Sequence, residues 1–364
     1  NKYGQSGLEM TDLFPHIAGC ADDIALVRSM TANFSEHAQG NFYMHTGFPF
    51  LGVPSAGAWV NYGLGSVNQN LPGYVVLNNK TGIPHGGKSI FGSGFLPATT
   101  GASFFNLDQD EVVSRVKPSR PLKEQRASLE FLEQLDGAFA KRSAAEGEVQ
   151  SAIKNYETAF RMQSAVPELM NLDKEPAYLK REYGFEHKDP LVAGYGQQCM
   201  VARRLVEKGV RFVELSCSNF KGDGQRPNPW DQHGNLPHGH QEMARQVDQP
   251  IAALINDLKQ RGLLESTLII FTGEFGRTPK VNGNGGRDHY PNVYSLAYAG
   301  GGIQGGQVYG ASNKKGTEPA AGACSPADIH ATAFRAMGID PRTELHDQLD
   351  RPFQLCDGNP LPLF

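Results

Sequence analysis

Apolar and polar positions follow two different patterns along the chain, and each pattern predicts a different kind of element. Short apolar runs bounded by polar residues, such as 23–27 and 74–77, are typical of buried strands. Residues 119–183 are charged, and their apolar positions recur every three or four residues, which predicts helices. We therefore expect 119–183 to be a helical insertion with a solvated flank and no chemistry of its own.

From residue 196 onward, helical and strand patterns follow one another in a regular order. The expected elements are a helix at 197–208, a strand at 210–215, a helix with an apolar stripe from Met243 to Leu258, strands at 267–271 and 293–298, and a helix that begins after Ser325. This order predicts a mainly parallel sheet covered by helices on both faces, which is a three-layer α/β/α sandwich. We expect residues 1–364 to form one large domain of this kind.

The composition narrows the class of protein. Glycine and proline, 42 and 23 of 364 residues, make up roughly 18% of the chain against an average of about 12%, which indicates many loops. The formal net charge of -4 provides no excess of cations for a phosphate backbone. No apolar stretch approaches the ~18 residues of a membrane span. We therefore expect neither a nucleic-acid partner nor a membrane span.

Side chains that can bind a metal follow two of the predicted strands. Asp231 and His233 come after the strand that ends at 215, and Glu274 and His289 come after the strand that ends at 271. Because ligands of open α/β sheets bind beyond the carboxyl ends of the strands, we expect these side chains to converge. Carboxylates and imidazoles suit zinc, manganese or iron, and more carboxylates favour calcium or magnesium. The alternative is that Asp231 caps a turn and His233 is a surface histidine.

Other polar residues near these loops have more than one interpretation. Arg277 can hold the oxygens of a sulfate or phosphate in its planar fork, or form an ion pair with Asp288 or Glu274. His238 and His240 open the helix after the Asp231 loop, so they either face the site or are solvated. The last helix begins with Ser325, Pro326 and Asp328, which resemble a capping box, and we interpret Asp328 and His330 as structural.

Several runs of residues resemble a known family over nearly the whole chain. They are 272–277 (TGEFGR), 286–289 (GRDH), 299–303 (AGGGI) with Gly305 and Gly306, and the shorter runs 3–7, 37–39, 230–231, 257–264 and 328–332. These runs resemble the sulfatase-like family of domain of unknown function 1501, a branch of the alkaline phosphatase superfamily. The resemblance implies an alkaline phosphatase-like fold and a metal-dependent hydrolase of sulfate or phosphate esters.

The resemblance also implies roles for individual residues. Asp231, His233 and His289 match the ligands of one metal in the superfamily, and Glu274 matches a carboxylate of a second metal position. Phe275 stands where the superfamily motif has a histidine, so the second position loses a nitrogen ligand in this chain. The implied cofactor is therefore a divalent metal, zinc, calcium or manganese, in a site that departs from the two-zinc arrangement.

His37 occupies the place of the superfamily nucleophile, which lies about nine residues before a Thr-Gly pair. In this chain that pair is Thr46-Gly47, and the match falls on His37, with Ser35 close by. His37 is then a nucleophile, a replacement for the lost metal ligand, or part of a site that uses metal-bound water. A structural histidine beside Glu36 is the remaining alternative. We expect a ligand or acid–base role for His37.

The sequence thus predicts a metal-dependent hydrolase that acts on a small-molecule or glycan ester. His37 and Arg277 are its candidate catalytic residues, and Asp231, His233, Glu274 and His289 its candidate metal ligands. A non-catalytic metal- or glycan-binding protein is the alternative, favoured by Phe275 and His37; a phosphomutase-like enzyme would need a Ser or Thr nucleophile. The resemblance further implies a first strand with a metal-binding Asp, expected upstream of Asn1, and a periplasmic or extracellular location.

Overall fold

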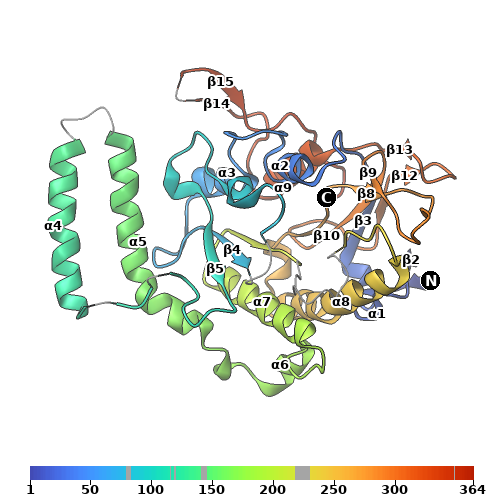
Figure 1. The fold of residues 1–364 in the computed structure, drawn as a ribbon, viewed down its shortest axis with the longest axis horizontal. Helices are drawn as coiled ribbons and strands as arrows, with labels where there is room; N and C mark the ends of the chain where they lie inside the picture. The colour runs from blue at the N-terminus through green and yellow to red at the C-terminus, as the bar shows by residue number, and fades with distance from the viewer. Residues whose placement is uncertain (79–82, 115, 119, 141–145, 218–229, 348) are drawn as a thin grey trace.

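The computed structural model describes residues 1–364 apart from 79–82, 115, 119, 141–145, 218–229 and 348 (Figure 1). In the described residues the longer strands form two separate sheets, one of four strands and one of three. Their bounds are β3 (Ile24–Met30), β4 (Tyr74–Asn78), β5 (Ser103–Asn106), β6 (Phe212–Leu215), β7 (Ile269–Phe271), β10 (Tyr294–Ala299) and β11 (Val308–Tyr309).

The four-stranded sheet has the order β11-β3-β10-β7. β10 runs antiparallel to both of its neighbours, with Ala297 opposite Leu26 on β3 and opposite Phe271 on β7, while β11 runs parallel to β3. β3 carries the apolar run that the sequence pattern assigns to a strand, and Ala25 and Val27 are fully buried. The predicted strands at 267–271 and 293–298 correspond to β7 and β10.

The three-stranded sheet is entirely parallel and has the order β5-β4-β6. β4 is its central strand, where Val75 lies opposite Ser103 on β5 and Val213 on β6. Every residue of β4 is buried, as expected of a continuous apolar run in the middle of a parallel sheet.

The predicted three-layer α/β/α sandwich with one mainly parallel, alkaline phosphatase-like central sheet is wrong. The fold is mixed α/β, but among the described strands only the three-stranded sheet is purely parallel, and the remaining sheets are small and separate. A parallel strand needs a crossover, usually a helix, whereas β7 is followed by a hairpin of β8 (Gly276–Arg277) and β9 (His289–Tyr290). This hairpin returns the chain without a helix, so β10 runs antiparallel to β7.

Two long helices connect the two sheets on one side. α7 (Pro190–Glu207) and α8 (Leu236–Gln260) pack against each other, and the apolar stripe of α8 is buried, as the sequence pattern predicts. Leu215 at the end of β6 and Phe271 at the end of β7 both pack against the core that these helices form. In the described part of the chain β6 and β7 each pair on one side only. An additional upstream strand stays a prediction.

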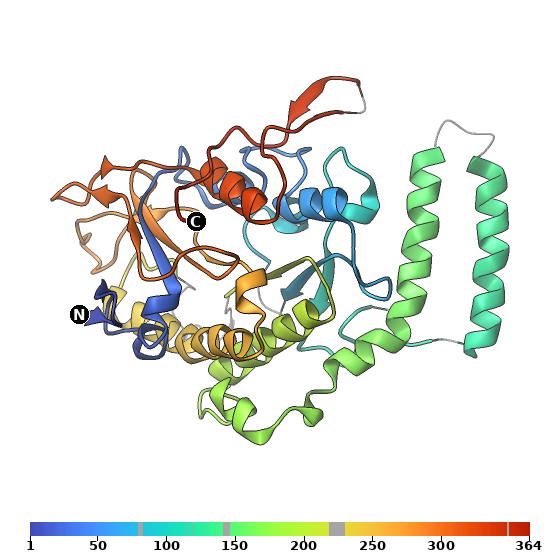
Figure 2. The same cartoon turned by 180° about the vertical axis from the view of Figure 1, so that it is seen from behind.

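The segment expected to be a helical insertion contains α4 (Leu122–Ala140), α5 (Glu146–Met170) and α6 (Ala177–Glu182). Residue 119, where the predicted segment begins, lies outside the described residues. Figures 1 and 2 show α4 and α5 side by side as an arm that stands away from the sheets. Only the end of the arm joins the core, where Val166 and Leu169 of α5 are buried.

The remaining helices and strands are short. The helices are α1 (Pro15–Ala18), α2 (His37–Thr46), α3 (Ala56–Leu64) and α9 (Pro326–Ala336). The strands are β1 (Lys2–Tyr3), β2 (Leu8–Glu9), β12 (Ala311–Ser312), β13 (Pro319–Ala321), β14 (Glu344–His346) and β15 (Pro352–Gln354). α9 begins with the predicted capping box, in which Asp328 accepts a hydrogen bond from the Ser325 backbone at 2.7 Å. Within the described residues, no helix combines the length and apolar character that crossing a bilayer requires.

Candidate metal centre

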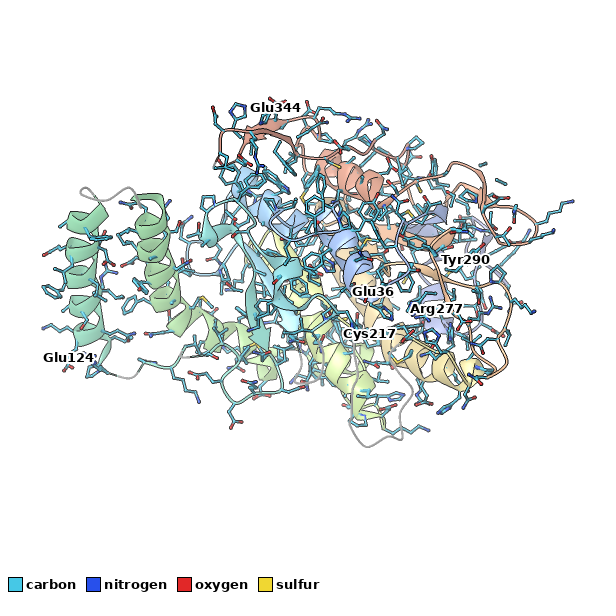
Figure 3. The ribbon with its side chains drawn as sticks, turned by 45° about the horizontal axis from the view of Figure 1, so that its top comes forward. Glu36, Glu124, Cys217, Arg277, Tyr290 and Glu344 are labelled. Carbon is cyan, nitrogen blue, oxygen red and sulfur yellow. The ribbon has the colours of Figure 1, made fainter. Side chains whose placement is uncertain are left out.

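Three segments that are far apart in the sequence meet at one place. They are the start of α2 with His37, the loop before α8 with Asp231 and His233, and the chain from β7 to β9 with Glu274 and His289. Figure 3 shows this region, marked by Glu36 and Arg277, well away from Glu124 on the arm. The structure thus brings the candidate ligands of the sequence analysis together without the arm.

His37 is held between two carboxylates. Its Nδ1 donates a hydrogen bond to Glu274 Oε1 at 2.5 Å, and its Nε2 lies 3.4 Å from Asp231 Oδ2. Gly40, one turn after His37, permits this arrangement, because a Cβ at Gly40 would lie only 3.0 Å from Glu274 Cγ. The small residue on α2 therefore lets the loop after β7 approach closely enough to orient the imidazole.

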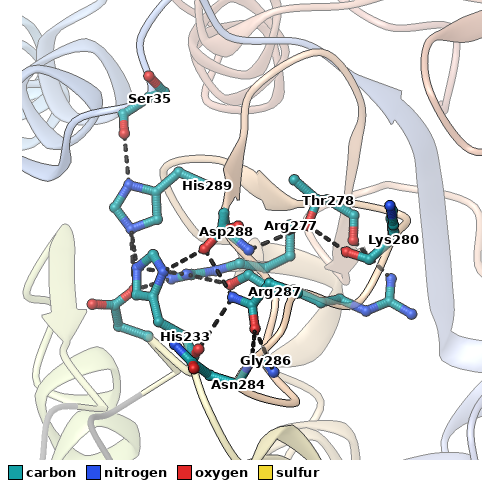
Figure 4. A network of polar contacts seen from close by, with 12 residues as sticks. Ser35, His233, Arg277, Thr278, Lys280, Asn284, Gly286, Arg287, Asp288 and His289 are labelled. Carbon is teal, nitrogen blue, oxygen red and sulfur yellow. Dashed lines mark hydrogen bonds and ion pairs between the residues drawn. The ribbon is translucent and has the colours of Figure 1, made fainter.

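His289 and His233 also contact Asp231, and Figure 4 shows the ring of His289 between Ser35 and His233. The Nδ1 of His289 donates to the Ser35 carbonyl at 2.6 Å, and its Nε2 lies 3.1 Å from Asp231 Oδ1. The Nδ1 of His233 pairs with Asp288 Oδ1 at 2.9 Å, and its Nε2 lies 3.0 Å from both Asp231 Oδ1 and His289 Nε2. Each ring thus has a hydrogen-bond acceptor at Nδ1.

The common feature of the three imidazoles is that Nδ1 carries the proton and Nε2 points inward. In a neutral imidazole this tautomer leaves a lone pair on Nε2, and lone pairs that converge on one carboxylate are an arrangement that a metal cation can occupy. Tetrahedral zinc, with bonds of 2.0–2.1 Å, separates its ligand atoms by about 3.3 Å. The observed separations of 3.0–3.4 Å fit that spacing, and His37, Asp231 and His289 each offer one ligand atom, all within 4.8 Å of one another.

The loop that carries Asp231 is set in place by unusual backbone. Trp230, directly before Asp231, has a φ of 57°, a conformation that bulky residues rarely adopt. Gly286 allows the β8–β9 hairpin to lie against this loop, because a Cβ there would come within 2.1 Å of the His233 carbonyl carbon. Strain of this kind is concentrated at functional sites. The backbone therefore fixes Asp231 and His233 against the hairpin that supplies His289.

Arg277 also contacts Asp231, and its guanidinium stays positively charged at every accessible pH. Its Nη2 lies 2.7 Å from Asp231 Oδ1, so the ion pair is with Asp231 and not with the Asp288 or Glu274 that the sequence analysis offered. The guanidinium also lies over the ring of Phe275, 5.8 Å from its centroid. Because it has five donors, Arg277 keeps donors for an anion beside the metal centre.

The electrostatics keep the carboxylates charged. Burial raises the pKa of Asp231, but the hydrogen bond and the charge of Arg277 outweigh it and hold that pKa well below its usual value. Burial also raises the pKa of Glu274, and the hydrogen bond from His37 outweighs it, so the net shift is downward. The same hydrogen bond is the main reason that the pKa of His37 is raised. The centre therefore carries negative charge that a divalent cation can neutralise.

Phe275 forms an apolar wall of the centre. It is buried, and its ring centroid lies 4.5 Å from that of His289 and 5.2 Å from that of His37. The resemblance implies a second metal position here, but Phe275 provides no ligand and Glu274 is hydrogen-bonded to His37. The residues present fit one metal better than two.

The other histidines singled out in the sequence lie outside this cluster. His238 is exposed at the start of α8, and His240 packs edge-on against Trp230 at 6.1 Å. His330 is buried, and its Nε2 donates to the Met44 carbonyl at 2.7 Å, which is the structural role expected of it.

Sequence reasoning missed His85. Its ring stacks on His37, with centroids 5.0 Å apart and planes at 23°. Its neighbours Gly86 and Gly87 have left-handed backbone, and a glycine pair is the sequence signal of a tight turn at that place. Nothing in the sequence connects that turn with α2, so the contact emerges only in the folded chain.

A comparison with known families identifies the group to which the chain belongs. The family model described as "Protein of unknown function (DUF1501)" matches residues 1–362, which is nearly the whole chain. This protein belongs to the DUF1501 family. No curated protein matches it. Because the description of DUF1501 states no activity, the function of this DUF1501 protein has to be inferred from its site.

Proposed function

We propose that this protein is a metal-dependent hydrolase of sulfate or phosphate esters. The observation that carries the proposal is the convergence of three imidazole Nε2 atoms, from His37, His233 and His289, on the carboxylate of Asp231. The resemblance of the runs around Glu274 and His289 to sulfatase-like proteins of the alkaline phosphatase superfamily supports the ester class. The substrate is a small-molecule or glycan ester.

The donor set favours a particular class of metal. Two or three nitrogens and one carboxylate suit zinc or manganese, whereas calcium prefers six to eight oxygens. His37, Asp231 and His289 would hold the ion, with His233 as a further nitrogen beside them. When bound, such a metal polarises an ester oxygen and lowers the pKa of a water.

The side chains of this protein supply the rest of the site. Arg277 binds the anionic oxygens of the ester through guanidinium donors left free by Asp231. Glu274 holds the proton of His37 at Nδ1 and so keeps Nε2 directed inward. Phe275 keeps water from one side of the centre, which strengthens the charge interactions within it.

The proposal is tested by metal content and turnover. Purified protein incubated with zinc or manganese should retain about one ion per chain and hydrolyse aryl sulfate or aryl phosphate esters. His289→Ala should lose both properties. His238→Ala is the matched control, because His238 is an exposed histidine at the start of α8, and it should keep both. Absence of metal and of turnover in the unaltered protein would overturn the proposal.

A non-catalytic metal- or glycan-binding protein is the second candidate. This candidate is favoured by Phe275, which lies beside His289 in place of a further nitrogen ligand. The site then fits one metal, whereas the enzymes of the superfamily that it resembles use two. In that case the protein binds metal and sulfated glycans, and His289→Ala abolishes metal binding, but no ester is turned over.

A further inference from the structure

His85 lies beside the candidate metal centre without being part of its ligand set. Its ring is stacked almost parallel on His37, so the two imidazoles present faces to each other. His85 is exposed. Among the described residues its ring has no hydrogen-bond partner, whereas His37, His233 and His289 each use their Nδ1.

The backbone holds His85 in this position. Asn41 lies on α2, one turn after His37, and its Nδ2 donates a hydrogen bond to the His85 carbonyl at 3.0 Å. Gly86 has a φ of 100°, and a Cβ there would meet Ile90 Cγ2 at 2.6 Å and lie 3.4 Å from the ring of Phe42. The turn after His85 therefore packs closely on α2, so the imidazole stays beside His37 while its own nitrogens remain available.

We propose that His85 contacts the substrate and donates a proton to the oxygen of its leaving group. This inference rests on the proposed hydrolase function and adds a residue to it. The oxygen of water forms a bond to phosphorus or sulfur and releases a proton to solvent, and the bond from that atom to the alcohol oxygen breaks. The alcohol oxygen takes the proton of a His85 ring N–H, and the imidazole then recovers a proton from solvent.

The chemistry of the other groups points to His85 for this role. An alkoxide is a poor leaving group unless it is protonated as it departs, and imidazole is the usual donor near neutral pH. Arg277 does not release a proton, and His37, His233 and His289 have their Nδ1–H groups committed and their Nε2 directed at Asp231. His85 is the imidazole next to this set whose ring nitrogens have no hydrogen-bond partner among the described residues.

The experiment compares esters whose alcohols differ in acidity. Full-length, metal-loaded protein is assayed with 4-nitrophenyl and simple alkyl esters of phosphate and sulfate, for the unaltered chain, His85→Asn and His85→Phe. The phenyl ring keeps the stacking on His37 but cannot donate. We expect kcat/KM for alkyl esters to fall about 100-fold in both variants and for 4-nitrophenyl esters less than about threefold. His346→Asn, at an exposed histidine on β14, should leave both esters unchanged.

A second measurement separates His85 from the metal ligands. Calorimetric zinc affinity should stay within about twofold in the His85 variants and fall strongly in His37→Ala. An equal loss of turnover for both kinds of ester, or no loss for either, overturns the role of His85 while the hydrolase proposal stands. If the unaltered protein turns over no ester, both proposals fail together.

Discussion

Two clusters of charged side chains in this protein differ in the cation that faces their carboxylates. Between α7 and α8, the buried Arg203 lies 2.7 Å from Glu175, 2.6 Å from Glu207 and 2.9 Å from Asp257. At the candidate metal centre, Asp231 faces three imidazoles in addition to one arginine. Both clusters gather carboxylates from segments distant in sequence. In the second cluster, however, most of the partners are imidazoles, which can lose their charge, whereas the guanidinium of the first cannot.

The difference shows which cluster serves the fold and which can serve chemistry. A guanidinium keeps its charge at every accessible pH and matches carboxylates with a rigid fork, so the cluster around Arg203 is complete without a ligand. An imidazole can give up its proton and present a lone pair to a metal instead. We therefore expect substitutions in the first cluster to cost stability and substitutions in the second to cost binding.

The largest effect is expected from Arg203→Met. Removal of the buried guanidinium breaks its ion pairs with Glu175 and Asp257, each of which keeps one other arginine at 2.5–2.6 Å, so the free energy of unfolding should fall by about 3 kcal/mol, the lower end for a broken buried ion pair. Urea titration measures this, and zinc affinity should not change. Arg126→Met is the matched control, because its contact with Glu157 at 2.9 Å is on the exposed arm, where solvent screens it, and its loss should have little effect. Equal losses of unfolding free energy for the two substitutions would contradict a special structural role for the cluster around Arg203.

Asp231→Asn should show the opposite behaviour. The substitution keeps the shape of the side chain but removes the charge on which the imidazoles converge, so zinc affinity should fall about 100- to 1,000-fold. In the absence of metal the free energy of unfolding should fall less than in Arg203→Met, because Asp231 is more exposed than Arg203. Calorimetry and urea titration on the same samples separate the two effects. A loss of stability as large as that of Arg203→Met would mean that this cluster is also structural.

His330 extends the comparison to an imidazole without a carboxylate. Burial is the main reason that its pKa is lowered to about 4, whereas the pKa of His37 is raised by Glu274. Between about pH 6.5 and pH 4 the unfolded chain takes up a proton at residue 330 that the folded chain does not, so stability should fall by about 3 kcal/mol as the pH decreases through that range. His330→Gln should reduce this slope. A constant difference between the two proteins from pH 7 to pH 4 would contradict the prediction.

The sequence predicts much of the local structure because local structure depends on local patterns. The apolar runs that became β3 and β4 and the stripe of α8 are visible as periodicities, and the capping box of α9 follows from three residues. The direction of β10 could not be predicted in this way. It depends on the hairpin between β7 and β10, whose pairing is a property of the folded chain.

In the candidate site, too, some features follow from local sequence patterns and others depend on the folded chain. Residue type and strand-end position were enough to select Asp231, His233 and His289 as neighbours, and the structure brings them together. The partner of Glu274 was not predictable, because its contact with His37 joins residues 237 positions apart and depends on the small side chain of Gly40. Glu274 was therefore predicted to be a metal ligand, whereas in the structure its Oε1 accepts a hydrogen bond from the imidazole of His37, itself a candidate ligand.

Glu274→Gln gives the smallest effect and the sharpest distinction. If Glu274 only orients His37, a glutamine that still accepts from Nδ1 should lower zinc affinity by about 10- to 100-fold, as is usual for groups that hydrogen-bond to ligands. Asp288→Asn, at the corresponding but more exposed partner of His233, should lower it by less than about tenfold. A loss for Glu274→Gln as large as that for Asp231→Asn would instead make Glu274 a ligand. On metal binding, Glu274 would then give up its hydrogen bond to His37 and bind the metal instead. The candidate metal centre would rearrange around its ligand, whereas the cluster around Arg203 is complete without one.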